Sequence, residues 1–261
     1  MTASTRDRAN PGVTIDGVLG GRLRIRQPAA GYRLAIDPVL LAAAVPARPG
    51  DRVLDVGCGV GTAGLCLAAR VDGVRVSGID LQCDMVALAA ASASDNGLAG
   101  RVDFITGDLL RPPPSLSAGA FDHVMANPPF AAAGRGHPPP DPTKAAAAVE
   151  GEARLADWLR FCLAMVRPKG SVTLIHRADR LDECLALMRQ GLGGLTVFPL
   201  WPGGIPAADH GPKPAKRVIV SGRKGIAAPL TLMPGLVLHG ADGTYTEAAE
   251  RVLRDGAALM V

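Results

Sequence analysis

The chain has 261 residues, of which 48% are hydrophobic and 20% are charged. This composition argues against disorder and fits one globular domain with additions, because domains usually have about 100–200 residues. No apolar run reaches the ~18 residues that cross a bilayer, and residues 1–12 lack the apolar core of a secretory signal. We therefore expect a cytoplasmic protein with no membrane partner.

Cysteine usage argues against a metal site. The five cysteines are scattered, odd in number and without a C-x-x-C pair, which does not fit a disulfide framework or a zinc cage. We expect reduced core cysteines and no bound metal. The cysteines are Cys58, Cys66, Cys83, Cys162 and Cys184.

Positive charge is concentrated in two stretches, although the whole chain carries only +4. Residues 1–35 hold six arginines against two aspartates, and residues 201–225 hold five basic residues against one aspartate, so each stretch has a net charge of +4. Such regions indicate an anionic partner such as RNA. A solvated face of an Arg-rich protein stays open as the alternative. The predicted RNA-binding residues are Arg22, Arg24, Arg26, Arg177, Lys213, Lys216, Arg223 and Lys224.

The N-terminal part predicts a β-hairpin followed by a helix. Residues 16–26 have a Gly20-Gly21 turn, and the alternation after it places Arg22, Arg24 and Arg26 on one strand face. Asp37 and Pro38 predict a helix start with Asp37 as the N-cap, ending near Pro46. We expect residues 1–36 to form an arm with a hairpin, and residues 37–261 to form one α/β domain.

From residue 52 onward, short β-branched runs alternate with Ala/Leu-rich stretches, which is typical of a parallel sheet flanked by helices. The predicted strands are 52–56, 74–79, 102–106, 121–126 and 171–176, followed by 196–200, 217–221 and a strand-like tail at 229–238. The predicted helices are 61–71, 84–95, 150–166, 179–190 and 245–254.

A glycine-rich loop follows the first predicted strand of this alternation. Residues 55–64 read D-V-G-C-G-V-G-T-A-G, and glycines at a strand-to-helix turn let the backbone approach a ligand. Gly59, Gly61 and Gly64 also satisfy the dinucleotide fingerprint G-x-G-x-x-G, with Asp80 at the distance expected for a ribose ligand. A nicotinamide-dependent dehydrogenase therefore remains open.

Two acidic positions favour S-adenosylmethionine over a dinucleotide. Asp55 lies two residues before Gly57, where a carboxylate repels a pyrophosphate but suits a ligand that carries an ammonium and a sulfonium. Gly107-Asp108 follows the third strand, where the Asp108 carboxylate can accept a hydrogen bond from the amino group of adenine. Asp80 and Asp108 as simple helix caps are the alternative.

The sequence N-P-P-F at residues 127–130 indicates amine chemistry. Proline fixes its own φ and restrains the preceding residue, so Asn127 and Pro128 are held extended. Their side-chain and main-chain oxygens can accept both N–H groups of a planar exocyclic amine and direct its lone pair at an electrophilic methyl group. Phe130 can stack on a base swung out of its helix or loop.

Together these motifs resemble the class I S-adenosylmethionine-dependent amino-methyltransferases, and in particular the bacterial tRNA1(Val) adenine N6-methyltransferase group. The resemblance extends from about Gly17 and includes the stretch before the first strand, residues 175–187 after the fifth strand, and the closing segments. It implies a Rossmann-like fold in which 37–261 is the methyltransferase domain, with a seven-stranded, mostly parallel sheet whose last strand is antiparallel. S-adenosylmethionine is the implied cofactor, and tRNA is the implied partner.

The resemblance also implies site residues. Asn127, Pro128, Pro129 and Phe130 would be catalytic, and Tyr32 and Asp37 would lie at the cofactor rim. The implied cofactor-binding residues are Tyr32, Asp37, Asp55, Gly57, Cys58, Gly59, Gly61, Asp80, Leu81, Gly107, Asp108, Leu109 and Asn127.

Several alternatives stay open. A guanine N2 amine of ribosomal RNA and a protein glutamine amide also present planar nitrogens, although the protein-amide group usually has tyrosine at the position of Phe130. From other classes, a dehydrogenase and a cofactor-binding RNA chaperone remain. The oligomeric state is open.

Overall fold

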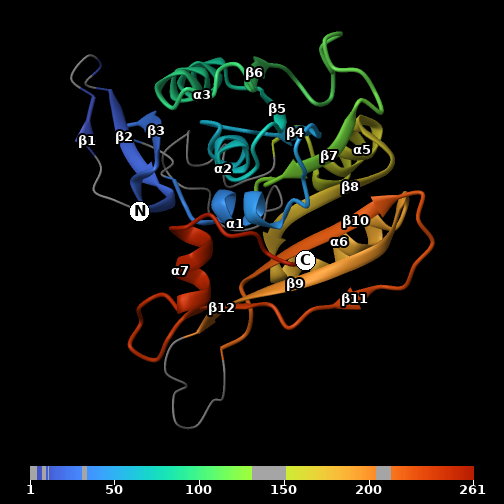
Figure 1. Ribbon diagram of the computed structural model, residues 1–261. Helices are drawn as coiled ribbons and strands as arrows, with labels where there is room; N and C mark the ends of the chain where they lie inside the picture. Colours follow the sequence, from blue (N-terminus) through green and yellow to red (C-terminus); the bar gives the residue numbers. More distant parts are fainter. Residues whose placement is uncertain (1–4, 8–9, 11, 31–33, 131–150, 204–212) are drawn as a thin grey trace.

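The computed structural model describes residues 5–7, 10, 12–30, 34–130, 151–203 and 213–261 (Figure 1). The N-terminal residues form a three-stranded antiparallel sheet of β1 (Thr5–Arg6), β2 (Val13–Val18) and β3 (Leu23–Pro28). The predicted hairpin is therefore present, with a 3₁₀ turn, η1 (Leu19–Gly21), in which both glycines have positive φ. Arg22 precedes β3 and donates to the carbonyls of Leu19 and Arg254, so the prediction of three arginines on one strand face is wrong.

The main sheet is mostly parallel, as predicted. Its strands β6, β5, β4, β7, β8, β10 and β9 are neighbours in that order, and β10 runs antiparallel to both β8 and β9. The predicted seven strands, mostly parallel with an antiparallel last strand, β10, are present within a sheet of nine strands. Two short strands, β11 (Thr231–Leu232) and β12 (Leu236–His239), extend it along β9. The long strands are β4 (Arg52–Val56), β5 (Arg75–Asp80), β6 (Val102–Thr106), β7 (Phe121–Ala126), β8 (Val166–Arg177), β9 (Leu192–Gly203) and β10 (Arg217–Lys224).

Helices cover both faces of this sheet (Figure 1). They are α1 (Asp37–Ala44), α2 (Thr62–Arg70), α3 (Cys83–Asp95), α5 (Leu155–Met165), α6 (Leu181–Met188), preceded by the 3₁₀ turn η2 (Ala178–Arg180), and α7 (Glu247–Leu253). None of these described helices is long and apolar enough to cross a membrane.

Two helix starts differ from the prediction. The helix predicted from residue 150 begins at Leu155, because Arg154 and Asp157 form a capping box in which the Asp157 carboxylate accepts the Arg154 amide at 3.0 Å. Asp37 is the first residue of α1 rather than its N-cap. Its carboxylate accepts a hydrogen bond from Arg217 at 3.1 Å, and Ile36 occupies the cap position.

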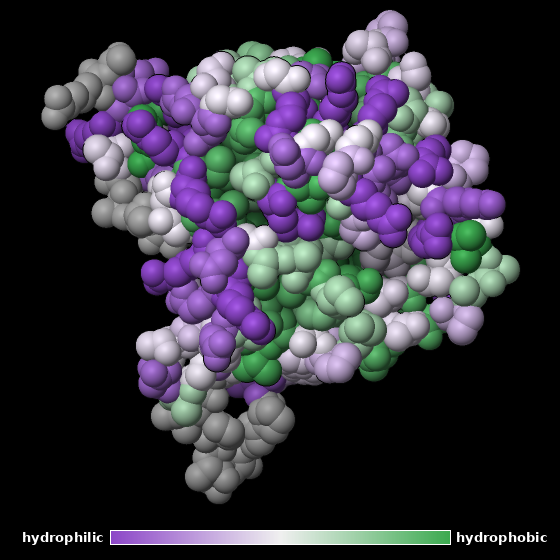
Figure 2. Space-filling view, in the orientation of Figure 1, coloured by the Kyte–Doolittle hydropathy of each residue, from purple (hydrophilic) through white to green (hydrophobic). Residues whose placement is uncertain are grey.

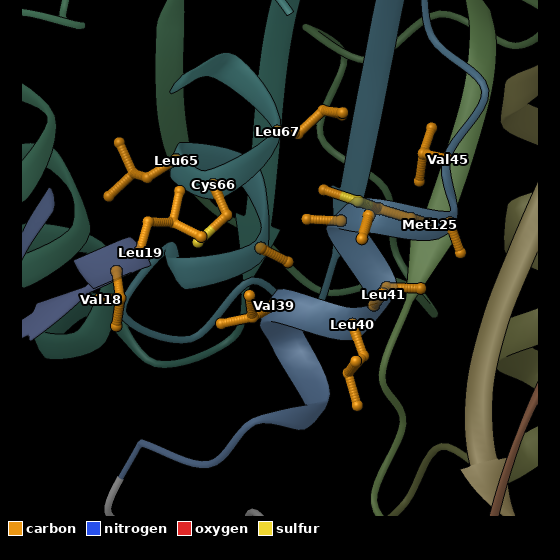
Figure 3. Close-up of a cluster of buried hydrophobic side chains, with 14 of the residues drawn as sticks. Val18, Leu19, Val39, Leu40, Leu41, Val45, Leu65, Cys66, Leu67 and Met125 are labelled. Atoms are coloured by element: carbon orange, nitrogen blue, oxygen red, sulfur yellow. The ribbon is translucent and has the colours of Figure 1, made fainter. Parts of the chain in front are cut away.

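The core on one face is built around α1. Figure 3 shows Val39, Leu40 and Leu41 of this helix among side chains from the N-terminal sheet, α2 and β7. Val18 and Leu19 belong to the same buried cluster, so the N-terminal sheet shares the core of the domain. On the molecular face in Figure 2, apolar side chains (green) gather near the C-terminal segment and are bordered by polar ones (purple).

Candidate functional site

The carboxyl ends of the parallel strands open into a pocket of about 450 Å³. It lies where the strand order reverses, since β5 and β7 flank β4 on opposite sides, and ligands bind at such switch points in α/β sheets. Loops after β4, β5, β6 and β7 line it, together with the end of β3 and the start of α5. Predicted site residues in this lining are Asp55, Gly57, Cys58, Gly59, Asp80, Leu81, Gly107, Asp108, Leu109, Asn127, Pro128, Pro129 and Phe130.

Three predicted cofactor residues are not in this lining. Gly61 lies behind the loop, against Phe104, and shapes the start of α2. Asp37 is buried and paired with Arg217, while its neighbour Pro38 reaches the pocket. Tyr32 lies outside the described residues.

The loop after β4 needs glycine at two positions for different reasons. At Gly57, φ is +68° and an added Cβ would lie 2.3 Å from Cη2 of Trp158. At Gly59, φ is +53° and no atom lies within 4 Å of an added Cβ. The amides of Gly57 and Cys58 donate to the carbonyl of Ile79 at 2.8 and 3.0 Å, which fastens the loop to β5. Glycine at position 57 therefore lets the loop pack closely against Trp158, whereas glycine at position 59 leaves open space beside the loop.

Asp55 is a buried carboxyl beneath this loop. The residue is 2% exposed, and its Oδ2 accepts a hydrogen bond from the amide of Gly64 at 3.1 Å. Burial raises the pKa of Asp55 to about 7, and the nearby charge of Asp80 acts in the same direction. A cationic ligand in the pocket would favour the ionised form of this carboxyl.

Asp80 and Asp108 hold their own loops and also line the pocket. Asp80 accepts the amides of Gly59 and Gln82 at 2.8 and 2.9 Å, and burial raises its pKa. Asp108 accepts the amide of Leu110 at 2.8 Å and pairs with Arg111, and these hydrogen bonds lower its pKa. Both carboxylates keep further lone pairs that can accept hydroxyl or amino protons.

Asn127 carries an unsatisfied acceptor. Its Oδ1 atom is buried and has no hydrogen-bond partner among the described residues. A buried acceptor without a partner costs about 1–3 kcal/mol, so such a group in a pocket points to a donor supplied by a ligand or water.

Two residues that the sequence did not identify contact the Phe130 ring. The guanidinium carbon of Arg217 lies 4.3 Å from the centroid of the Phe130 ring. His176 meets the same ring in a T-shaped contact at 5.6 Å between centroids. His176 is fully buried, and burial with the nearby charges of Arg180 and Arg217 lowers its pKa to about 4, so its ring is neutral. Asp37 completes the group through Arg217.

Several predicted RNA-binding side chains already have partners within the protein. Arg26 pairs with Asp7 and with Asp95, and Arg177 pairs with Asp179. Arg223 donates to the carbonyl of Lys169, and Lys224 donates to the carbonyls of Leu163 and Val166 at the end of α5.

Strand direction also separates these residues. Because β10 is antiparallel, Arg217 lies beside Arg177 at the pocket edge, whereas Arg223 pairs with Ser171 near the opposite edge, roughly 20 Å away at 3.3 Å per residue. Arg223 and Lys224 are thus far from the pocket. Arg24, Lys213 and Lys216 are exposed and have no side-chain partner among the described residues.

Comparisons with known proteins agree with this geometry. Residues 33–138 match the methyltransferase small domain. The tRNA1(Val) (adenine(37)-N6)-methyltransferase of Dickeya chrysanthemi is 25% identical over 96% of this chain and 98% of its own length. An rRNA N(6)-adenosine-methyltransferase of Caenorhabditis elegans is 24% identical over 66% of this chain and 72% of its own. The crystal structure of a predicted O-methyltransferase from Agrobacterium tumefaciens superposes with a TM-score of 0.69, at 26% identity over 85% of this chain and 98% of that one.

The fold and the pocket define a class I S-adenosylmethionine-dependent methyltransferase. Within this class, the resemblance of the chain to the tRNA1(Val) adenine N6-methyltransferase group is confirmed. The relatives named above are methyltransferases, so the dehydrogenase interpretation of the glycine loop gains no support. No group of His, Cys, Asp or Glu side chains in the described ranges could hold a metal ion.

The pocket fits the cofactor of this class. Its acidic lining suits an ammonium and a sulfonium, and Gly59 leaves open space beside the loop. The Oδ1 atom of Asn127, which has no partner among the described residues, can accept a hydrogen bond. S-adenosylmethionine, when bound, supplies an electrophilic methyl group.

The raised pKa of Asp55 predicts pH-dependent cofactor binding. Below about pH 7 the carboxyl is neutral, and a cationic ligand must displace its proton to gain the ionic contact. We expect the affinity for S-adenosylmethionine to rise as the pH increases through about 7, with proton release. Titration calorimetry in buffers of different ionisation enthalpy measures both. The Asp55→Asn variant should show neither effect, and an equal pH dependence in this variant would contradict the prediction.

Asp55 also makes the stability of the cofactor-free protein depend on pH, and this stability falls as the pH rises, whereas the cofactor affinity increases. Its folded-state pKa lies above its ordinary value of 3.8, so its stabilising effect is complete below about 3.8 and is lost as the pH rises through about 7. A rise of the pKa from 3.8 to about 7 corresponds to roughly 4 kcal/mol at most. Urea unfolding at pH 5 and pH 8 should therefore show a larger loss for the wild type than for Asp55→Asn.

Proposed function

We propose that this protein transfers a methyl group from S-adenosylmethionine to the N6 amine of an adenine in tRNA, at the nucleotide next to the anticodon. The observation that carries the proposal is the buried, unpartnered Oδ1 of Asn127 beside two prolines and Phe130, at the end of a pocket suited to the cofactor. The relatives from Dickeya chrysanthemi and Caenorhabditis elegans both act on adenine N6 in RNA, by their names, and differ in the RNA.

In this proposal, the Asn127 oxygen accepts one N–H of the adenine amine, and the Pro128 carbonyl accepts the other. These bonds draw the nitrogen out of conjugation with the ring, so its lone pair can form the new N–C bond while the S–C bond breaks and its electron pair stays on sulfur. The nitrogen then loses a proton to water, because it becomes acidic once alkylated. Phe130 stacks on the extruded base.

We further propose that the acidic lining holds the cofactor. Asp55 faces its positive charge, Asp80 accepts the ribose hydroxyls, and Asp108 accepts the adenine amino group. Leu81 contributes apolar contact, since this residue is 70% exposed, lines the pocket and can cover an adenine face. Residues Gly57, Cys58, Gly59, Gly107 and Leu109 provide backbone close to the ligand.

The decisive experiment is transfer of labelled methyl groups to purified RNA and protein, followed by nucleoside mass spectrometry of the RNA and peptide mass spectrometry of the protein. N6-methyladenosine in tRNA supports the proposal. N2-methylguanosine in ribosomal RNA, methylglutamine in protein, or a methylated hydroxyl overturns it. N6-methyladenosine formed only in ribosomal RNA overturns the assignment to tRNA. Binding of both ligands without transfer identifies the RNA chaperone.

RNA affinity should depend strongly on salt and on the pocket edge. Lys213 and Lys216 are exposed just before β10, whose first residue lies at this edge, so they can contact phosphates. We expect log affinity for tRNA to fall linearly with log salt, and the slope to decrease by about 1 in Lys216→Ala. Filter binding or fluorescence anisotropy at 50–300 mM salt measures the slope.

The matched control for this measurement is Arg75→Ala. Arg75 is exposed at the start of β5, on the opposite edge of the sheet, and should keep the wild-type slope. A flat salt response in the wild type would remove RNA as the partner, and equal slopes in both variants would place RNA elsewhere on the surface.

A further inference from the structure

Phe130 is contacted by two residues that are distant from it in the chain. Arg217, at the start of β10, places its guanidinium over the ring, with 4.3 Å between Cζ and the ring centroid. His176, near the end of β8, meets the ring at an interplanar angle of 85°. The strand register explains the meeting, because Val218 pairs with His176 and Arg217 pairs with Arg177 across the antiparallel β8–β10 ladder.

Arg217 is itself fixed in place. Its Nε donates to Oδ2 of Asp37 at 3.1 Å, and one terminal nitrogen donates to the carbonyl of Lys216 at 3.3 Å. The Asp37 side chain is only 12% exposed, on the first turn of α1, so the anchor is rigid. A planar guanidinium can stack on an aromatic ring and bond to a carboxylate at the same time, whereas a lysine ammonium lacks the planar fork.

The covered and uncovered parts of the ring have different surroundings. The guanidinium lies over the Phe130 ring from β10, and Phe130 is a half-buried residue of the pocket lining. The ring is the last residue of the stiff N-P-P-F segment, which also carries the unpartnered Asn127 oxygen. Fixing the ring therefore restrains the N-P-P-F segment, called here the acceptor loop, at its last residue.

We propose that Arg217, anchored by Asp37 and backed by His176, is a positioning residue that holds Phe130 and the acceptor loop in the orientation that receives the target base. This inference rests on the proposed stacking role of Phe130. The competing role for Arg217 is direct contact with an RNA phosphate, since its side chain is 32% exposed.

The two roles predict opposite results for Asp37→Asn. If Asp37 anchors Arg217 as a positioning residue, its loss lowers the single-turnover rate of methyl transfer. If Asp37 merely neutralises a phosphate-binding arginine, its loss strengthens RNA binding and raises the salt slope. Thermal unfolding and cofactor binding of each variant are measured first, so that only folded, cofactor-competent variants are compared.

A double-mutant cycle provides the second test. Arg217→Ala is expected to lower the single-turnover rate about tenfold, on the scale of one partly buried cation–π contact, with unchanged cofactor affinity. In the Phe130→Leu background, the same substitution should have almost no further effect, because Arg217 acts through the ring. Arg217→Gln, which keeps a planar polar head on a shorter, uncharged side chain, serves if the alanine variant does not fold. Arg189→Ala, on the exposed end of α6, is the arginine control.

Additive losses in the cycle would overturn the positioning role of Arg217 and assign it to phosphate contact. A reduced salt dependence of tRNA affinity in Arg217→Ala would do the same. The cycle is measured on whichever acceptor the wild type methylates. A wild type that leaves tRNA unmodified therefore refutes the proposed function but does not test the positioning role of Arg217. The double-mutant cycle then tests that role on the acceptor that is methylated.

Discussion

Replacement of Asn127 by alanine should lower the turnover of methyl transfer by about 10² or more, the scale of losing an oriented polar contact in a transition state. The substitution removes a buried side-chain acceptor of this pocket-lining residue, which has no partner in the described structure. Cofactor affinity should remain nearly unchanged, because the Asp55, Asp80 and glycine-loop contacts are left intact. Single-turnover transfer and titration calorimetry measure the two quantities separately.

The stability of the same variant gives an independent check. A buried acceptor without a partner destabilises the free protein, so Asn127→Ala should unfold at an equal or higher urea concentration than the wild type. Lower stability together with lost activity would indicate a structural role instead. Wild-type turnover in the alanine variant would refute the catalytic assignment.

Replacement of Gly57 by alanine should damage the cofactor loop severely. The new Cβ would lie 2.3 Å from Cη2 and 2.6 Å from Cζ3 of Trp158, which is itself buried. The left-handed backbone at φ +68° adds a cost of about 1–2 kcal/mol for a residue with a Cβ. Overpacking adds about 1–3 kcal/mol, so we expect a loss of roughly 2–5 kcal/mol in the free energy of unfolding and no measurable cofactor binding. Urea unfolding and calorimetry measure both.

Gly59→Ala is the matched control for the stability measurement. Its backbone is also left-handed, at φ +53°, but an added Cβ meets no atom within 4 Å. Only the backbone cost of about 1–2 kcal/mol should remain. Equal destabilisation by the two substitutions would show that contact with Trp158 is not what requires glycine at position 57.

Local motifs in the sequence were sufficient to predict much of the pocket. The loop from Asp55 to Gly61, the acidic residues after the next two strands, and N-P-P-F are each contiguous and follow predicted strands. In a parallel sheet the carboxyl ends of these strands meet at one edge, so their loops had to converge. Thirteen of the predicted site residues line one pocket for this reason.

The predicted RNA-binding residues could not be sorted in the same way. Arg223 and Lys216 are seven positions apart in the basic stretch, yet the antiparallel course of β10 sends them toward opposite edges of the sheet. The partners that occupy Arg26, Arg223 and Lys224 are backbone carbonyls or carboxylates from other elements. A charge count includes all of these cations, because it contains no information on which charges are already paired.

The sequence by itself was sufficient to predict the α/β class, the strands of the parallel half and most of the residues that line the pocket, because each depends on residues close together in the chain. Only the tertiary structure decided what holds Phe130. Asp37 and Arg217 are 180 residues apart, and His176 reaches the same ring through a strand ladder. Contacts of this kind depend on the register and direction of paired strands, which composition and local periodicity do not specify.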